Sequence, residues 1–419
     1  MLSQHRCTFL SKLRRGSCAG PMKRITVLYA YLGFYRDAGG EHAPLGLAEE
    51  LDRERFSFEI VTLMPTTSRI GAAVQATGCP VHELRLGIPR LTNPIGMLKV
   101  LKAFYQTFRR IQPDIVQTQS PFCNVWARLA AKLARVPIVI ATINFDEPPP
   151  PWFLRPVMRT MQSWLATSTT AYVCVAEHVR QNQLHPDEWD RAEIIHSFFD
   201  LPRFLSGRAN LPAIRALTDP ARPVLGLVGR LEFEKGHRVA IAAMRTIVEA
   251  IPGARLQIVG TGSLAQALRE QVVALGLSAY VEFTGHQPQI CEIMTHMDLL
   301  LIPSYNEAFG KVVLESIAAG VPLVGSRSGA FPEILEHGKY GTLVAPSDPA
   351  ALADAALAII ANPAPALAKL RAARATVLPR YTKEDSARHH AELYCRLTHT
   401  SSGHIAKRPP VRNNSIPVE

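Results

Sequence analysis

Short apolar runs alternate with longer amphipathic stretches along most of this chain. The first run, residues 24–32, is rich in β-branched side chains, and a glycine-containing loop and a helical pattern of apolar residues follow it. Strands that alternate with helices form parallel sheets covered on both faces, so the pattern predicts a doubly wound α/β fold. Further strands are expected at 58–63, 114–117, 137–142, 171–175, 224–228, 255–259, 281–283, 299–302 and 322–325. Helices are expected at 95–111, 124–135, 236–250, 263–275, 288–296, 310–319, 349–361 and 383–397.

The alternation lapses in a proline-rich stretch around residues 200–222. Because 419 residues exceed what one hydrophobic core usually supports, we interpret this lapse as a domain boundary. Ligands of open parallel sheets bind beyond the carboxyl ends of the strands, so two such sheets in tandem place a ligand crevice between the domains. We divide the chain into a flexible basic extension at 1–21, an N-terminal Rossmann-like domain at 22–205, a linker at 206–222, a C-terminal Rossmann-like domain at 223–380, a final helix at 381–397 and a polar, disordered tail at 398–419.

Composition narrows the class of protein. The net charge of +11 is compatible with a phosphorylated ligand or an anionic membrane surface, but the basic residues are scattered and no aromatic-basic RNA motif occurs, which disfavours nucleic acid. The seven cysteines form no C-x-x-C pair, so neither a zinc site nor a disulfide framework is indicated, and a cytosolic compartment fits. No apolar run reaches the roughly 18–20 residues of a membrane span. The basic extension also lacks the apolar core of a secretory signal.

Loops at three strand ends of the second domain face the same crevice. The first loop reads GRLEFEKG and carries Arg230 and Lys235, whose charges suit a diphosphate. The second reads VGTGS, and Gly260 and Gly262 let backbone N–H groups approach a ligand at the start of a helix. Each loop alone has an ordinary structural explanation, as a charged surface segment or a turn.

The third loop reads NEAFGKVVLE and holds two glutamates, Glu307 and Glu315, around the start of a helix. Phe309 and Gly310 present free N–H groups and the positive end of the helix dipole to the crevice. We expect phosphate at this helix start, sugar hydroxyls on Glu307 and ribose hydroxyls on Glu315. Carboxylates near a helix start also stabilise the helix by about 0.3–1 kcal/mol each, but the three loops together predict a nucleotide-sugar site.

Four segments of the second domain, 228–236, 258–264, 303–320 and 321–346, resemble the retaining GT-B glycosyltransferases that carry an E-x7-E motif. The first domain is similar more loosely: GGEHAPLGLAEEL resembles the glycine loop and first helix of that family, and PIVIAT resembles a central strand. The final helix, ending AELYCRL, resembles the one that crosses back onto the first domain. The resemblance implies the GT-B fold, with an acceptor domain followed by a donor domain.

The resemblance further implies transfer of a sugar from a nucleotide donor to an acceptor hydroxyl, with retention at the anomeric carbon. Its implied catalytic residues are Arg230 and Lys235, which hold the leaving diphosphate, and Glu307, which contacts the donor sugar. Its implied donor-binding residues are Gly39, Gly40, Gly229, Gly260, Gly262, Phe309, Gly310 and Glu315. No D-x-D triplet occurs, so we expect metal-independent chemistry and no cofactor beyond the nucleotide-sugar substrate.

The acceptor side departs from the family. Many members place a histidine shortly after the strand that matches PIVIAT, where this chain has Asn144, so Asn144 and the nearby Asp146 are acceptor-side candidates. The aromatic and basic stretch at 145–165, with the helix at 95–111, suits an anionic membrane interface. The alternative, slightly favoured, is that these aromatics belong to the core and the charges to a solvated face.

We therefore expect a hexosyltransferase-type enzyme of cell-surface, exopolysaccharide or glycolipid synthesis, with a glycan or lipid-linked acceptor. We expect it in the cytoplasm, with a peripheral position on the inner face of the cytoplasmic membrane as a further hypothesis. A GT-B sugar-nucleotide epimerase or phosphorylase, or a non-catalytic nucleotide-sugar-binding protein, remains an alternative. An epimerase would turn over its nucleotide sugar without an acceptor. A dehydrogenase is disfavoured because no G-x-G-x-x-G fingerprint occurs.

Overall fold

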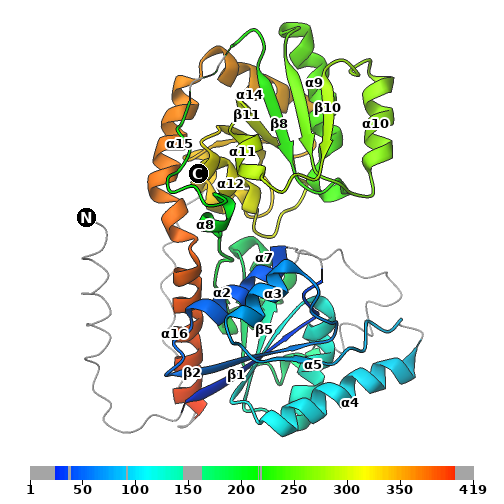
Figure 1. Ribbon diagram of the computed structural model, residues 1–419, viewed down its shortest axis with the longest axis vertical. Coiled ribbons are helices and arrows are strands. Elements are labelled where there is room, and N and C mark those ends of the chain that lie inside the picture. The colour runs from blue at the N-terminus through cyan, green and yellow to red at the C-terminus, as the bar shows by residue number, and fades with distance from the viewer. Residues whose placement is uncertain are drawn as a thin grey trace.

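The computed structural model describes residues 24–35, 39–90, 93–144, 163–215, 217 and 219–401. These residues form two α/β domains, and Figure 1 shows them as two lobes with the last two long helices, α15 and α16, running along one side. Every strand pairing in both sheets is parallel, as the sequence pattern predicted.

The N-terminal domain has a seven-stranded sheet in the order β3-β2-β1-β4-β5-β6-β7. The strand order reverses between β1 and β4, where Val27 lies opposite Ile115, so the topological switch point lies at that pair. The strands are β1 (Ile25–Tyr31), β2 (Phe56–Thr62), β3 (Val81–Glu83), β4 (Ile115–Gln119), β5 (Ile138–Ile143), β6 (Ala171–Cys174) and β7 (Ala192–Ile194). The helices are η1 (Gly39–Glu41), α2 (His42–Glu50), α3 (Arg69–Ala76), α4 (Pro94–Ile111), α5 (Pro121–Ala134), α7 (Glu177–Gln183), η2 (Pro186–Arg191) and α8 (Leu201–Phe204), where η marks a 3₁₀ helix.

The C-terminal domain has a six-stranded sheet in the order β10-β9-β8-β11-β12-β13, with its reversal between β8 and β11. The strands are β8 (Val224–Val228), β9 (Arg255–Val259), β10 (Val281–Gly285), β11 (Leu299–Ile302), β12 (Leu323–Ser326) and β13 (Thr342–Val344). The helices are η3 (Phe233–Lys235), α9 (His237–Ala250), α10 (Ala265–Ala274), α11 (Ile290–Met294), α12 (Lys311–Ala319), α13 (Phe331–Ile334), η4 (Glu336–Gly338), α14 (Pro349–Ala361), α15 (Ala364–Thr376), η5 (Leu378–Arg380) and α16 (Lys383–Ser401).

Local signals explain why several helices begin where they do. The side chain of Asn93 accepts a hydrogen bond from Gly96 N at the start of α4, and Pro94 takes the first helical position. The side chain of Asp348 accepts from Ala351 N in the same way at the start of α14, with Pro349 at the first position. Both helices start within one residue of the predicted position, because a capping residue followed by proline can be recognised from the local sequence.

The expected final helix is longer than predicted and belongs to the N-terminal core. It continues to Ser401, past the expected end at residue 397, so the start of the predicted disordered tail is helical. Leu393 and Tyr394 of α16 are fully buried against the first sheet, and Tyr394 Oη donates to Gln117 Oε1 of β4 at 2.5 Å. The chain therefore leaves the second domain and completes the hydrophobic core of the first.

Three short edge strands and five α-helices of the described residues were missed by the sequence prediction. The strands β3, β7 and β13 have three residues each and are only half-buried, so no long apolar run marks them. The helices are α3, α7, α8, α13 and α15. Two of these, α3 and α7, span eight and seven residues, which is too short for a clear helical period in the sequence.

We expect Tyr394→Phe to lower the free energy of unfolding by about 1–3 kcal/mol, because Gln117 Oε1 would be buried without its donor. Chemical denaturation of the two proteins measures this difference. Tyr105→Phe, at a tyrosine with 38% exposure on α4, is the control and should stay within about 0.5 kcal/mol of the wild type. Equal losses for the two variants would contradict the assigned role of the Tyr394 hydroxyl.

Candidate active site

The loop after β11 lies at the interface of the two domains. Asn306 Oδ1 of this loop lies 3.3 Å from His178 Nε2 of α7, in the N-terminal domain. At the head of α12, the Lys311 ammonium lies 5.9 Å from the centre of the Phe198 ring. The predicted third loop therefore faces the other domain, as the topology of two facing sheets requires.

An ion pair joins the first and third predicted loops. Lys235 Nζ lies 2.5 Å from Glu307 Oε2, and their side chains are 19% and 16% exposed. The backbones of the two loops also touch, because Tyr305 N donates to Glu234 O at 2.8 Å. The structure thus brings together two predicted catalytic residues that lie 72 positions apart in the sequence.

A glycine makes this close approach of the two loops possible. Gly236 has a φ of +67°, and a β-carbon on it would lie 1.9 Å from the carbonyl oxygen of Pro303. Any other residue at this position would push the first loop away from the third. Gly236 was not among the residues predicted for the site, although a glycine directly after a cation in a strand-end loop was a usable signal.

Arg230 is not part of the Lys235–Glu307 pair. Its side chain is 72% exposed, and Nη2 lies 2.8 Å from Glu234 Oε1 on the same loop. The expected clamp of Arg230 and Lys235 on one anion is therefore not assembled in this structure.

Glycines of the second loop serve packing between loops. A β-carbon on Gly260 would lie 1.9 Å from Gly229 O, and one on Gly262 would lie 2.5 Å from Leu231 O. The first and second loops are thus held against each other by backbone contact. The N–H and hydroxyl of Ser263, just before α10, both donate to the Glu232 carboxylate, at 3.0 and 2.6 Å.

The third loop turns into α12 through a left-handed residue. Gly310 has a φ of +83°, and a β-carbon there would lie 2.4 Å from the Phe331 ring. Phe309 is 7% exposed and packs edge-on against Tyr381, with ring centres 5.5 Å apart. The phenyl group of Phe309 is thus a packing group, while the N-terminus of α12 opens toward the domain interface.

Two ionisable groups of α12 influence each other. Burial raises the pKa of the Glu315 carboxyl, and the ammonium groups of Lys311 and Lys235 oppose this shift. Burial lowers the pKa of Lys311 to about 8, and the carboxylate of Glu315 opposes that shift. Lys311 was missed by the sequence analysis, although a lysine in the first turn of a helix is unfavourable for the helix dipole and could have been noticed.

The glycine loop of the N-terminal domain reaches the same region. His42 directly follows η1, and burial lowers its pKa to about 2, with repulsion from Lys311 and Arg203 adding to the shift. The imidazole is therefore neutral. His42 and Lys311 both lie near the Phe198 ring, whose centre is 6.5 Å from the His42 ring centre and 5.9 Å from Lys311 Nζ. The end of the loop that contains Gly39 and Gly40 is therefore close to the head of α12.

Polar groups gather around Gly40 at the carboxyl ends of the first sheet. Gln119 Nε2 donates to Gly40 O at 3.0 Å, and a β-carbon on Gly40 would lie 3.4 Å from Tyr31 Oη and 3.7 Å from Asn144 Nδ2. Asn144 Oδ1 is buried and has no hydrogen-bond partner among the described residues. The other acceptor-side candidate, Asp146, lies outside the described residues.

Ser120, directly after β4, combines a strained backbone with a side-chain hydroxyl that has no partner among the described residues. It has a φ of +87°, and its buried Oγ has no partner in the part of the chain that the structure describes. A non-glycine residue in this conformation stores strain, which proteins concentrate at functional sites.

The described residues contain no group of three or more His, Cys, Asp or Glu side chains placed to hold a metal ion. No single described helix is long and apolar enough to cross a bilayer, and the one candidate is a pair bent by 95°.

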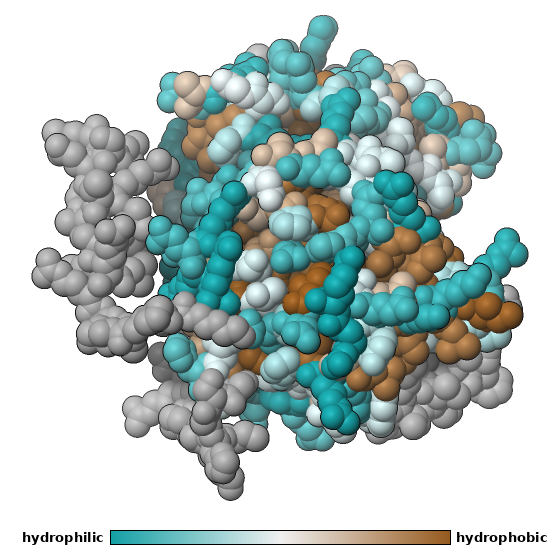
Figure 2. All heavy atoms as spheres, turned by 60° about the horizontal axis from the view of Figure 1, so that its bottom comes forward, coloured by the Kyte–Doolittle hydropathy of each residue, from teal (hydrophilic) through white to brown (hydrophobic). Residues whose placement is uncertain are grey.

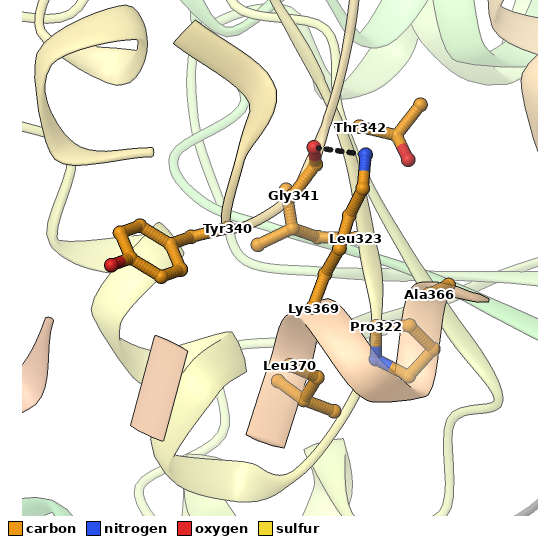
Figure 3. A pocket seen from close by; sticks show the side chains of 8 residues that line it. All are labelled: Pro322, Leu323, Tyr340, Gly341, Thr342, Ala366, Lys369 and Leu370. Atoms are coloured by element: carbon orange, nitrogen blue, oxygen red, sulfur yellow. Dashed lines mark hydrogen bonds between the residues drawn. The ribbon is translucent and has the colours of Figure 1, made fainter. Parts of the chain in front are cut away.

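A small hollow on the C-terminal domain is separate from these residues. It lies between α15 and the β12–β13 edge of the sheet, and Lys369 Nζ donates there to Gly341 O at 3.3 Å (Figure 3). None of the residues predicted for the site lines it.

Two parallel-sheet domains that face each other, with a final helix returning to the first, define the GT-B fold. Residues 215–376 match the family described as "Glycosyl transferases group 1", and residues 38–195 match the "Glycosyl transferase 4-like domain". Glycogen synthase of Mycobacterium tuberculosis (strain ATCC 25618 / H37Rv) is 30% identical over 297 residues, which cover 69% of this chain and 70% of that protein. The chain therefore belongs to the group 1 glycosyltransferases.

Other relatives agree with this assignment. The 2-deoxystreptamine glucosyltransferase of Streptomyces kanamyceticus is 29% identical over 329 residues, covering 72% of this chain and 82% of that protein. Among solved structures, Anabaena HepE in complex with UDP has a TM-score of 0.71 at 19% identity and covers 89% of this chain and 100% of that chain. At this identity the likeness shows the shared fold.

We expect Lys235→Met to lower kcat for sugar transfer by about 100–1000-fold, because one preorganised charge at the reacting centre typically contributes that much. Steady-state rates measure the loss. Arg245→Met is the control, since Arg245 forms a surface pair with Glu249 in which both side chains are about two-thirds exposed. A Lys235→Met enzyme that keeps more than about a tenth of kcat would contradict the assignment.

Proposed function

We propose that this protein is a retaining glycosyltransferase that moves a sugar from a nucleotide-sugar donor to an acceptor hydroxyl without a metal ion. The observation that carries the proposal is the Lys235–Glu307 pair at the head of α12, with Glu315 farther along the same helix. The structural neighbour HepE has been solved with UDP and with UDP-glucose, which supports a nucleotide-sugar donor here.

The leaving diphosphate is proposed to bind between Lys235 and the N-terminus of α12. Backbone N–H groups and the positive end of a helix dipole stabilise an anion at such a place. A bound diphosphate would replace Glu307 as the partner of Lys235. Glu307 would then be free to accept hydrogen bonds from hydroxyls of the donor sugar, and Glu315 would do so for the ribose.

Arg230 would join the site only after a change of side-chain conformation. It would have to leave Glu234, and an exposed ion pair of that kind is worth about 0.2–1 kcal/mol. The diphosphate offers a stronger, bidentate partner for the guanidinium group. We therefore keep Arg230 as a proposed catalytic residue that the donor recruits.

The acceptor is proposed to bind at the carboxyl ends of β4 and β5. The unpartnered groups there, Asn144 Oδ1 and Ser120 Oγ, are uncharged, and the imidazole of the nearby His42 is neutral. Neutral donors and acceptors suit the hydroxyl groups of a sugar better than an anion. A glycan, free or lipid-linked, is therefore the proposed acceptor class, in keeping with cell-surface polysaccharide or glycolipid synthesis.

Exposed apolar and basic side chains on α4 support a peripheral membrane contact. Ile95 and Leu98 are 67% and 62% exposed, and Lys99 and Lys102 beside them are exposed as well. Residues 84–113 contain six arginines and lysines and no aspartate or glutamate. Figure 2, which turns this side of the molecule forward, shows hydrophobic and hydrophilic groups interleaved on its surface.

An interleaved surface of this kind favours an anionic membrane over a purely solvated face. The exposed isoleucine and leucine of α4 thus weigh against the sequence-based alternative of a solvated charged face. We propose that the enzyme acts at the inner face of the cytoplasmic membrane. Most of the aromatic stretch at 145–165, on which this hypothesis also rested, lies outside the described residues.

A thermal-shift screen with UDP, GDP, ADP and their sugar conjugates tests the donor site. A nucleotide at 100 times its dissociation constant should stabilise the folded protein by about 2.7 kcal/mol, equally with Mg²⁺ and with EDTA. We expect Glu315→Ala to lose most of the shift and the surface variant Glu249→Ala to keep it. No shift with any nucleotide would overturn the donor site. Conversion of a nucleotide sugar into its epimer, with no acceptor present and no release of nucleoside diphosphate, would favour an epimerase.

Sedimentation with vesicles tests the membrane contact. We expect binding to vesicles that contain anionic lipid but not to neutral ones. The double variant Ile95→Ser/Leu98→Ser should bind anionic vesicles at least about fivefold more weakly, because these two apolar side chains would enter the bilayer and contribute most of the insertion energy. Val273→Ser, at a 69% exposed valine of α10 in the donor domain, is the matched control. If the α4 double variant and the Val273→Ser control bound vesicles equally well, the membrane contact would have to lie on another surface.

A further inference from the structure

Three segments that are distant in the sequence meet at His196, where the chain leaves the first sheet. His196 Nε2 lies 2.7 Å from Glu333 Oε1 of α13, in the donor domain. The His196 ring packs edge-on against Tyr381, which precedes α16, with centres 5.2 Å apart. The hydroxyl of Ser386 in α16 donates to the His196 carbonyl at 3.2 Å. His196 therefore contacts both the donor domain and the returning helix.

The Glu333 carboxylate is held by two groups of the N-terminal domain. Its Oε1 pairs with His196, and its Oε2 accepts a hydrogen bond of 2.9 Å from the backbone N–H of Glu177, the first residue of α7. A carboxylate at the first N–H of a helix is in a favourable electrostatic position. One side chain of the donor domain thus bridges two separate elements of the other domain.

Glu333 is tied to the donor loop through its own short helix. Ala330 N, at the start of α13, donates to Glu307 O at 2.9 Å. A β-carbon on Gly329 would lie 2.2 Å from the same carbonyl oxygen, so the backbones are in direct contact. The ring of Phe331 closes against Gly310 at the head of α12. Any shift of α13 therefore moves the backbone of Glu307.

A second path links the same junction to the donor loop. Tyr381, which packs on His196, also packs edge-on against Phe309, with centres 5.5 Å apart. The Tyr381 carbonyl accepts a hydrogen bond of 2.8 Å from Phe199 N on the segment that joins the domains. Two chains of contacts thus run from the N-terminal domain to residues on either side of Ala308.

We propose that Glu333 and His196 are positioning residues that fix the Glu307 loop relative to the N-terminal domain. This inference rests on the proposed donor site. The groups proposed to hold the donor, Lys235, Glu307 and Glu315, all belong to the second domain, whereas the acceptor groups belong to the first. The pair therefore sets how the bound donor is aligned with the acceptor, and it contributes little to donor binding itself.

The effect expected from this role differs from that of an ordinary ion pair. An exposed ion pair contributes little to stability, and an ordinary one has no direct effect on the reaction rate. A misplacement of about 1 Å between reacting groups can cost about 100-fold in rate. His82 and Glu59 form a His–Glu pair at 2.8 Å with similar exposure, but both partners lie in the first domain. This pair is a matched control, because it has the same two side chains but does not connect the domains.

The test measures steady-state release of nucleoside diphosphate from the nucleotide sugar that gives the largest thermal shift, with a sugar or water as the accepting hydroxyl. We expect Glu333→Ala and His196→Ala each to lower kcat by about 10- to 100-fold and to change the donor KM by less than about threefold. The double variant should lose no more than the single ones, because the same contact is removed. His82→Ala and Glu59→Ala should keep kcat within about twofold.

Glu333→Gln separates positioning from folding. Its amide offers an oxygen for the Glu177 N–H and an N–H₂ group for a ring nitrogen of His196, so it should recover most of kcat. His196→Ala removes the bridge without any change in the donor domain, so a loss there does not come from misfolding of α13. Unchanged kcat in Glu333→Ala and His196→Ala, with an active wild type, would overturn this inference alone. A wild type that neither binds nor turns over a nucleotide sugar would instead overturn the proposed function.

Discussion

The pairing of Lys235 with Glu307 is the interaction on which the proposed donor site depends. It joins the loop after β8 to the loop after β11. These two strands are neighbours in the sheet, although the start of β11 lies 71 residues after the end of β8 in the sequence. The pair forms because Gly236 lets the two loop backbones meet at Pro303. Without that contact, the cation would lie on an isolated loop and the carboxylate would lose its partner.

The same arrangement brings several partly buried charges close together at the domain interface. Lys235 and Lys311 lie near Glu307 and Glu315, and the neutral His42 faces them from the other domain. Partly desolvated charges in such a group stabilise one another only when they are paired, and a ligand that carries several charges and hydroxyls can satisfy them better than the protein does alone. Asn144 Oδ1 and Ser120 Oγ likewise lack hydrogen-bond partners among the described residues, at the proposed acceptor side.

Much of the fold follows from local patterns. The buried strands β1, β8 and β11 carry apolar runs, and α4 and α14 carry a cap followed by proline, so their existence and approximate bounds were readable. The edge strands β3, β7 and β13 were missed because three half-buried residues leave no run. The candidate site was readable as three loops, since a glycine or a charge directly after a strand is visible in the sequence.

The sequence by itself determined which residue types stand at the strand ends, and with them the two-domain fold and the neighbourhood of Lys235, Glu307 and Glu315. Only the tertiary structure decided that Arg230 turns to Glu234, that His42 faces Lys311, and that Glu333 joins His196 across 137 residues. The physical reason is the range of the forces. Strands and caps depend on neighbours along the chain, whereas side-chain partners depend on how two separately packed domains meet.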